Sequence, residues 1–280
     1  MSKKKVLFVT QEMEPYTVAN EISRVCRALP QHIQEKGMEL RLLMPRYGTI
    51  NERRHRLHEV VRLSGMNIIV DDDDFPLIIK VASIPKARMQ VYFLDNEDFF
   101  KRKFIHHDKN GKPFKDNADR MVFFNKGIIE TVKKFGWAPD IVHCHGWMTS
   151  LLPAFIREAY RTEPLFHESK IVYSLYDTSL EENFTEDFFV KAAINNLDEE
   201  VFEPFRREDG SISLHRGALH WADAVVRGSE EYSEENTQLL EKTDLPVLDF
   251  PGATPDEFNT KIREFYLEQI TEEEVEEVEG

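Results

Sequence analysis

Residues 3–10 read KKKVLFVT, a continuous run of apolar residues behind a short basic start. Such a run, rich in β-branched and aromatic side chains, predicts a strand that is buried on both faces, as in a parallel sheet. Apolar residues then recur at helical spacing from Ile22 to Ile33, and Gly37 gives a stop signal. Residues 39–44, ELRLLM, predict a second strand. The chain therefore opens with a strand, a helix and a strand, the βαβ unit of a parallel α/β fold.

The same alternation continues through the rest of the chain. Residues 116–135 predict the strongest helix, because their acidic start, apolar stripe and basic end agree with the helix dipole. Residues 67–70, 76–82 and 89–94 predict strands with no helix between them, and hence a hairpin-like insertion. Further strands are expected at 141–144, 170–175, 224–227 and around Val247, and further helices at 150–160, 213–221, 231–242 and 255–270. The prediction is an α/β fold over residues 1–270, a Rossmann-like parallel sheet flanked by helices.

Composition and charge exclude several classes of protein. Acidic residues outnumber basic ones by 51 to 36, which disfavours nucleic acid as a partner, because each neutralised phosphate needs a cation. No apolar run approaches the roughly 20 residues of a membrane span, and the start is too short for a signal peptide, so we expect no membrane and a cytoplasmic location. Cys26 and Cys144 are too few for a disulfide framework. Residues 271–280, TEEEVEEVEG, predict a disordered acidic tail.

The sharpest local feature is residues 140–147, DIVHCHGW, in which a short apolar strand ends in His, Gly and Trp. Ligands of open parallel sheets bind at the carboxyl ends of the strands, so His145 and Trp147 are candidates for a ligand site. His143 lies inside the strand, and for this residue a satisfied core histidine is the favoured interpretation.

Metal and phosphate sites find little support in the sequence. A phosphate cradle after the first strand needs glycine, but residues 10–23 contain no glycine and three glutamates. The run of aspartates at residues 71–74 lacks the alternate-residue pattern of a calcium loop. His106 and His107 are adjacent, and this spacing suits a shared metal poorly. We therefore predict neither a metal nor a cofactor.

Two stretches of the chain are locally basic. One holds six arginines between Arg41 and Arg62, and the other holds Arg102 and five lysines between Lys101 and Lys115. A solvated face or a loop explains such stretches more often than an anion site does, and this is the favoured interpretation for both.

Several motifs follow one another along nearly the whole chain. The opening holds EMEPY at residues 12–16, ALP at 28–30 and MPRYG at 44–48. Later come VYFLDNEDF at residues 91–99, WAPDIVHCHGWMT at 137–149 and ADAVVRGSEEY at 222–232. In these motifs the chain resembles the amino-terminal half of bacterial glycogen and starch synthases, which are retaining glycosyltransferases of the GT-B fold. The resemblance implies that residues 1–270 form the amino-terminal, starch synthase catalytic-type domain of that fold.

The resemblance also implies that most of the family's chemistry is missing. In the family, Lys-Thr-Gly-Gly follows the first turn and meets the phosphates of the sugar nucleotide, and residues 18–21, VANE, stand in its place here. The family's His-Asp-Trp-His becomes HGWM at residues 145–148, so His145 is a remnant of the histidine that holds the transferred glucose. The family also uses a second Rossmann-like domain to bind most of ADP-glucose, and we expect these 280 residues to lack it.

These features predict a glycogen or starch synthase-like protein of α-glucan metabolism without independent ADP-glucose transferase activity. It would act as a glucan-binding or regulatory subunit, with Tyr16, Tyr47 and Trp147 as stacking faces and His145 as a polar contact for a sugar. Two alternatives stay open. One is a glucosyltransferase, a glycogen synthase active only with a partner chain such as a full-length synthase. The other is a homodimeric interaction protein in which a second copy covers the cleft.

Overall fold

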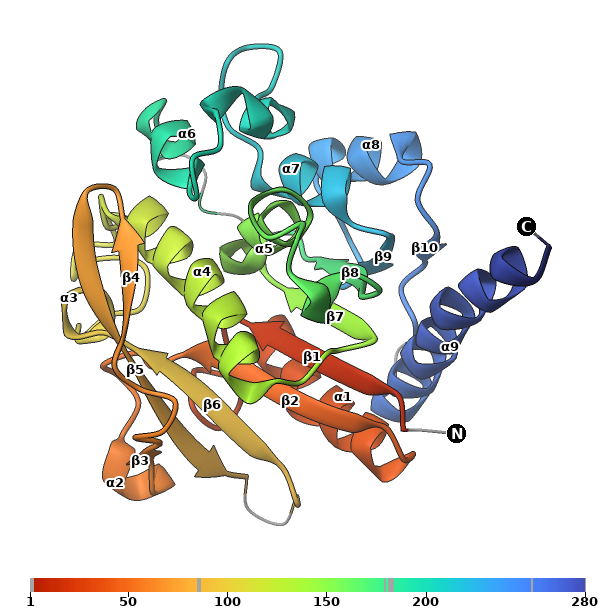
Figure 1. Cartoon of the computed structure of the whole chain (residues 1–280), viewed down its shortest axis with the longest axis horizontal. Coiled ribbons are helices and arrows are strands. Elements are labelled where there is room, and N and C mark those ends of the chain that lie inside the picture. Colours follow the sequence, from red (N-terminus) through yellow and green to blue (C-terminus); the bar gives the residue numbers. More distant parts are fainter. Residues whose placement is uncertain (1–2, 85–86, 179, 181–183, 253, 280) are drawn as a thin grey trace.

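The computed structural model describes residues 3–84, 87–178, 180, 184–252 and 254–279, and beyond residue 270 it describes the backbone alone. In these residues ten strands form a mixed, mostly parallel sheet in the order β10-β9-β8-β7-β1-β2-β6-β5-β3, with β4 paired on β5 (Figure 1). The strands are β1 (Lys5–Thr10), β2 (Glu39–Pro45), β3 (His58–Glu59), β4 (Met66–Val70), β5 (Asp73–Ser83), β6 (Gln90–Asp95), β7 (Ile141–His145), β8 (Lys170–Leu175), β9 (Ala224–Arg227) and β10 (Val247–Leu248).

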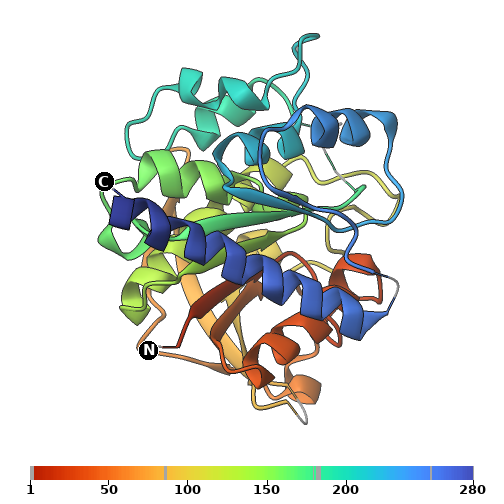
Figure 2. The same ribbon diagram turned by 90° about the vertical axis from the view of Figure 1, so that its right-hand side faces the viewer.

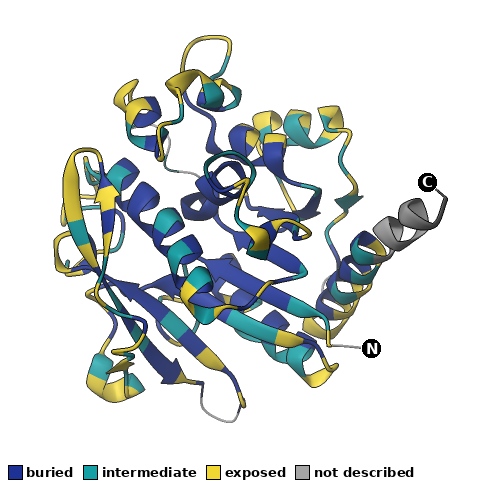
Figure 3. Ribbon diagram, viewed as in Figure 1, coloured by how far each residue is buried: buried dark blue, intermediate teal, exposed yellow. Residues whose placement is uncertain are grey.

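The centre of the sheet is β1, which pairs in parallel with β2 on one side and with β7 on the other. Phe8 lies opposite Leu42 of β2 and His143 of β7. Both β1 and β7 are buried almost along their whole length, as Figure 3 shows in dark blue. This burial confirms the parallel α/β prediction made from the apolar run at residues 3–10, because such strands need helices on both faces.

Helices cover both faces of this sheet. The α-helices are α1 (Glu21–Glu35), α2 (Glu52–His55), α3 (Glu97–Phe100), α4 (Asn117–Phe135), α5 (Leu151–Ala154), α6 (Asp187–Ala192), α7 (Leu214–Trp221), α8 (Glu234–Lys242) and α9 (Pro255–Glu279). Shorter 3-10 or π turns are η1 (Trp147–Thr149), η2 (Phe155–Ala159), η3 (Pro164–Phe166) and η5 (Glu199–Phe205). One face carries α1 and α9, which pack on each other (Figure 2), and the other carries α4, α5 and α7.

The insertion after β2 is built from antiparallel strands. β5 pairs antiparallel with β4 on one side and with β6 on the other, and β6 then joins β2 in parallel. The predicted hairpin-like insertion is therefore confirmed. The short elements α2 and β3, which precede it, escape prediction because four and two residues carry too little periodicity.

The helix predicted at residues 150–160 differs from the structure. Three kinds of winding follow one another there, namely η1, the four-residue α5 and the π turn η2. Pro153 lies in the first turn of α5, where backbone N–H groups have no partner within the helix, so it is compatible with this start and does not explain the π turn that follows.

The helix α9 runs over Pro255–Glu279, beyond the end at residue 270 that the periodicity predicts. Phe258, Ile262, Phe265 and Tyr266 form its buried stripe. α9 packs on α1, and its Tyr266 contacts His143 of β7, so the two helices together cover the face of the sheet opposite α4, α5 and α7 (Figure 2). The disorder expected for residues 271–280 stays a prediction.

Candidate functional site

The place to look for a ligand in this sheet is the carboxyl end of β1 and β7. The chain leaves β1 towards β2 on one side and later returns to β7 on the other, so the strand order reverses at this point. Open α/β sheets bind ligands in the crevice that such a reversal creates. The residues that follow Thr10 and His145 therefore decide what this edge can do.

Gln11 fills the crevice between the two strands. Its backbone N–H donates to the His145 carbonyl at 3.3 Å, and its side-chain Oε1 accepts from the Met148 N–H at 3.1 Å. Gly146 has φ +86°, and a Cβ atom there would lie 2.4 Å from Gln11 Oε1. Gln11 is buried, so its amide closes the space between β1 and η1.

The carboxylate of Glu12 is hydrogen-bonded by side chains of the same loop. Asn20 Nδ2 donates to Glu12 Oε2 at 2.6 Å, and Gln11 Nε2 donates to Glu12 Oε1 at 3.1 Å. Burial raises the pKa of Glu12, while the hydrogen bonds from Gln11 and Asn20 oppose that rise. Asn20 also caps α1, because its Oδ1 accepts from the Ser23 N–H at 2.8 Å. The loop after β1 is thus closed by its own side chains.

The residues around this cap are poorly suited to a diphosphate. Val18 is 80% exposed and offers no charge. Glu21 lies in the first turn of α1, where its carboxylate accepts from Ser229 Oγ at 2.5 Å. Ser229 Oγ in turn accepts from the Asp177 N–H at 3.1 Å, so Glu21 is tied to the ends of β8 and β9. A carboxylate at a helix N-terminus occupies the position that a bound anion would favour, and it repels one.

The four residues predicted to bind sugar are all buried. The Tyr16 ring meets His55 and Phe93 edge to face, each at 4.9 Å between centroids. Trp147 and Tyr47 belong to a different cluster, in which both rings contact His106, at 4.9 Å and 5.6 Å. The structure therefore does not bring Tyr16 together with the other rings, and none of these three rings presents an open face. Their sugar-binding role stays a prediction.

His145 is the last residue of β7, and its side chain is buried in the core. Its ring stacks on Phe8 at 6.0 Å and lies 3.8 Å from the His143 ring between centroids. Nδ1 is 3.0 Å from the Tyr176 hydroxyl, and Nε2 has no hydrogen-bond partner among the described residues. Burial lowers the pKa of His145 to about 3, so the ring is neutral at physiological pH. His143 hydrogen-bonds Ser174 at 2.7 Å and the hydroxyl of Tyr266 on α9, as expected of a core histidine.

A cavity of about 340 Å³ opens beside this edge, between α1 and the start of α9. We call it the α1–α9 pocket. Phe250 and Phe258 line it, with their ring centroids 5.8 Å apart, and Glu21, Arg24 and Asn259 add polar groups. Apolar rings with a few convergent polar groups are typical of sites for small polar organic ligands.

Within the described residues, no group of three or more His, Cys, Asp or Glu side chains is placed to share a metal ion. None of the helices in that part of the chain is both long and apolar enough to cross a membrane.

Comparison with known proteins identifies the family of this chain. Residues 5–244 match the family described as the starch synthase catalytic domain. The chain belongs to this family. Its relatives include a glycogen synthase of Chlorobaculum parvum, 35% identical over 232 residues, and one of Chlorobium chlorochromatii, 36% identical over 251 residues. The alignments cover 82% and 87% of this chain but 47% and 51% of those proteins, so the chain spans about half the length of these relatives.

A solved structure confirms the fold of this family in the chain. The catalytic domain of starch synthase IV from Arabidopsis thaliana, which was solved with ADP and acarbose bound, superposes with a TM-score of 0.65. It is 19% identical in sequence, and the match covers 80% of this chain and 45% of that one. The expected resemblance to glycogen and starch synthases is thus confirmed, and so is the α/β Rossmann-like half of a GT-B fold.

The sequence alone missed several residues of this edge. Gln11 follows the first strand directly, and the rule that selected His145 at the end of its strand would have selected Gln11 too. Phe250, Phe258 and Asn259 carry no such signal, because only the packing of α9 on α1 brings them to the edge.

Proposed function

We propose that this chain takes part in α-glucan metabolism as a glucan-binding or regulatory member of the starch synthase family, without transferring glucose from ADP-glucose unaided. The observation that carries the proposal is the closed loop after β1, in which Gln11, Glu12 and Asn20 satisfy one another. Electrostatic stabilisation of a leaving diphosphate is commonly the largest catalytic term in such a transfer. Val18 and Glu21 supply no cation for it.

The α1–α9 pocket supports the glucan-binding part of the proposal. The Phe250 ring, which is only partly buried, can pack against the C–H face of a sugar, and Glu21 and Asn259 can hydrogen-bond its hydroxyl groups. Because the Trp147 and Tyr47 rings are buried against His106, this pocket offers a glucan chain a more open aromatic surface.

A radiolabelled ADP-glucose transfer assay tests the catalytic part. We expect the pure chain to incorporate no glucose into glycogen, and we expect it to change the rate of a full-length glycogen synthase mixed with it. Incorporation by the chain alone would contradict the proposal. An unchanged rate in the mixture would remove the regulatory role.

Native gel electrophoresis in the presence of glycogen tests the binding part. We expect glycogen to retard the chain and the Phe250→Ala substitution to abolish that retardation. Phe104→Ala is the matched control, because Phe104 is an exposed phenylalanine outside the pocket. Migration that glycogen leaves unchanged, or equal retardation of both variants, would exclude the α1–α9 pocket as the glucan site.

A further inference from the structure

A second cavity, of about 490 Å³, lies at the carboxyl ends of β2 and β6, on the same edge of the sheet. Five basic side chains line it, those of Arg46, Lys80, Lys101, Arg102 and Lys103. We call it the basic pocket. Glu52 and Glu97 are the two carboxylates in its wall, so the side chains that face the cavity carry more positive than negative charge.

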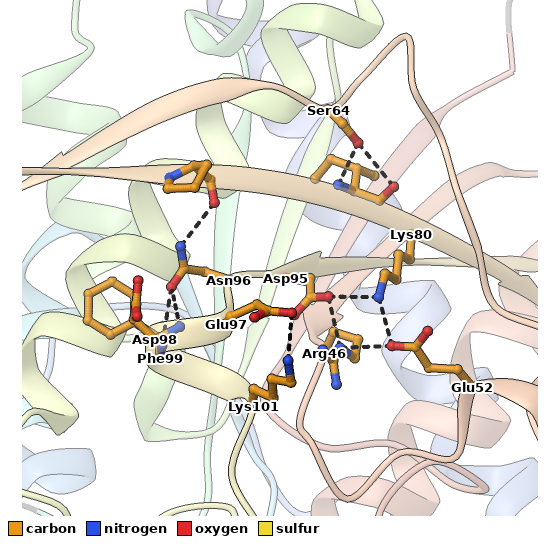
Figure 4. Close-up of polar contacts among 12 residues, drawn as sticks. Arg46, Glu52, Ser64, Lys80, Asp95, Asn96, Glu97, Asp98, Phe99 and Lys101 are labelled. Atoms are coloured by element: carbon orange, nitrogen blue, oxygen red, sulfur yellow. Dashed lines mark hydrogen bonds and ion pairs between the residues drawn. The ribbon is translucent and has the colours of Figure 1, made fainter.

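The floor of the basic pocket is an ion-pair cluster around a buried carboxylate. Asp95 Oδ2 is 3.0 Å from Arg46 Nε and 2.9 Å from Lys80 Nζ. Lys80 also reaches Glu52 Oε1 at 2.7 Å, as Figure 4 shows. Burial lowers the pKa of Lys80, but its hydrogen bonds with Glu52 and Asp95 outweigh this and raise it overall. A fixed, charged floor is therefore in place without any ligand.

Arg46 has donors to spare in this cluster. Its side chain is only 8% exposed, and its Nε lies 3.0 Å from Asp95 Oδ2 and 3.4 Å from Glu52 Oε1, ion pairs in which Nε makes no hydrogen bond of good geometry. Among the described residues, no hydrogen bond occupies the two Nη groups of its guanidinium. A guanidinium carries five N–H donors in a planar fork that matches phosphate or carboxylate oxygens. A buried cation with free donors at the wall of a basic cavity therefore indicates a site for an anionic ligand.

Another wall of the pocket is formed by Gly48 and residues 101–103, and backbone contacts fix these two segments against each other. The Gly48 N–H donates to the Phe100 carbonyl at 2.7 Å. A Cβ atom at Gly48 would lie 2.4 Å from the Arg102 carbonyl oxygen, so only glycine lets the two segments approach this closely. Arg102 itself is anchored by a two-pronged contact with Asp116. Lys101 and Lys103 therefore flank a fixed residue.

Two lysines at the mouth of the pocket remain available for a ligand. Lys101 pairs with Glu97 at 2.8 Å, but their side chains are 59% and 74% exposed, and such a pair in water is weak. Lys103 is exposed and has no ion pair within the described part of the chain. An anion can therefore pair with Lys101 and Lys103 without breaking a strong ion pair.

We propose that the basic pocket binds a small phosphate-bearing anion, with the phosphate held by Lys101, Lys103 and the head of Arg46. The pocket is larger than a phosphate group, and Glu52 and Glu97 can accept hydrogen bonds from hydroxyl groups on the rest of the ligand. This assignment is independent of the glucan proposal, because the basic pocket and the α1–α9 pocket share no residue. It also replaces the solvated-face interpretation for residues 101–103.

Titration calorimetry with glycerol 3-phosphate, inorganic phosphate and glycerol tests the assignment on the whole chain. We expect saturable binding of both phosphate compounds at one site, none of glycerol, and weaker binding when salt rises from about 50 to about 300 mM. The double substitution Lys101→Ala, Lys103→Ala should weaken binding at least about tenfold, since it removes two charge-assisted contacts. Because both lysines are exposed, we expect the melting temperature to stay unchanged.

The matched control is the double substitution Lys109→Ala, Lys112→Ala. It removes the same charge from two exposed lysines of the same segment that do not line the pocket. We expect it to leave the affinity for glycerol 3-phosphate unchanged within about twofold. Absence of saturable phosphate binding to the native chain would overturn the proposal. Equal weakening by the two double variants would overturn it as well, because the binding would then follow net charge alone.

Discussion

His145 shows how a single residue couples burial to acid stability. Burial lowers its pKa to about 3, whereas an exposed histidine titrates near pH 6.5. Between these two values the unfolded chain takes up a proton that the folded chain does not. The stability that His145 contributes is therefore complete above about pH 6.5 and is lost as the pH falls towards 3.

We predict that His145 alone lowers the free energy of unfolding by about 2 kcal/mol between pH 7.5 and pH 5. In His145→Phe, which keeps a ring against Phe8, this part of the pH dependence should disappear. Urea denaturation at the two pH values measures it, and His167→Gln, at an exposed histidine, is the control. An unchanged pH dependence in His145→Phe would show that the ring is accessible to protons in the folded protein.

At the scale of elements, the turn from β7 into η1 depends on Gly146. Its φ of +86° favours glycine, and a Cβ atom there would collide with the side chain of Gln11. Gly111 is a useful comparison, because its φ of +78° is similar but nothing lies within 4 Å of an added Cβ atom. The two positions therefore separate backbone strain from collision.

We predict that Gly111→Ala lowers the free energy of unfolding by about 1 kcal/mol, the cost of the backbone conformation alone. Gly146→Ala should cost about 2 kcal/mol more, because the amide of Gln11 must leave the Met148 N–H unpaired. Thermal and urea denaturation of the two variants measure the difference. Equal losses in both would show that Gln11 moves aside freely and does not close the crevice.

The elements themselves were largely predictable, because their signals are local. The apolar run of β1, the residues of β8 and the helical stripe of α4 lie close to where the sequence places them. The 3-10 turn η5 escaped prediction, because its Phe202 and Phe205 are fixed by Trp221 on α7 rather than by a pattern of their own. The length of α9 could be predicted in part, but the face of the sheet that it covers could not.

The candidate site was less predictable than the elements, because burial at this edge depends on distant segments. The sequence predicts Trp147 as a candidate ligand contact at the end of a strand, yet His106, from the segment after β6, packs against its ring. Tyr16 is enclosed in the same way by His55 and Phe93. No local sequence pattern predicts these contacts. In contrast, the replacement of the family's Lys-Thr-Gly-Gly by VANE at residues 18–21 could be recognised from the sequence directly.

At the scale of the whole molecule, the chain combines the fold of the starch synthase family with an edge that its own side chains close. The fold follows from the family match over residues 5–244 and from the superposed starch synthase domain. The proposal that the chain does not transfer glucose unaided rests on the loop after β1, and the cytoplasmic location and the homodimer stay predictions.

Equilibrium titration of the chain with ADP-glucose tests this central claim most directly. We predict no saturable binding up to about 1 mM, because Glu12, Asn20 and Glu21 already pair with groups of the chain in the loop where the family resemblance places the diphosphate. The combined substitution Val18→Lys, Ala19→Thr, Asn20→Gly, Glu21→Gly should raise the affinity for ADP-glucose above that of the native chain, because it adds a cation and removes a carboxylate beside the N-terminus of α1. Binding of ADP-glucose to the native chain in the micromolar range would contradict the account.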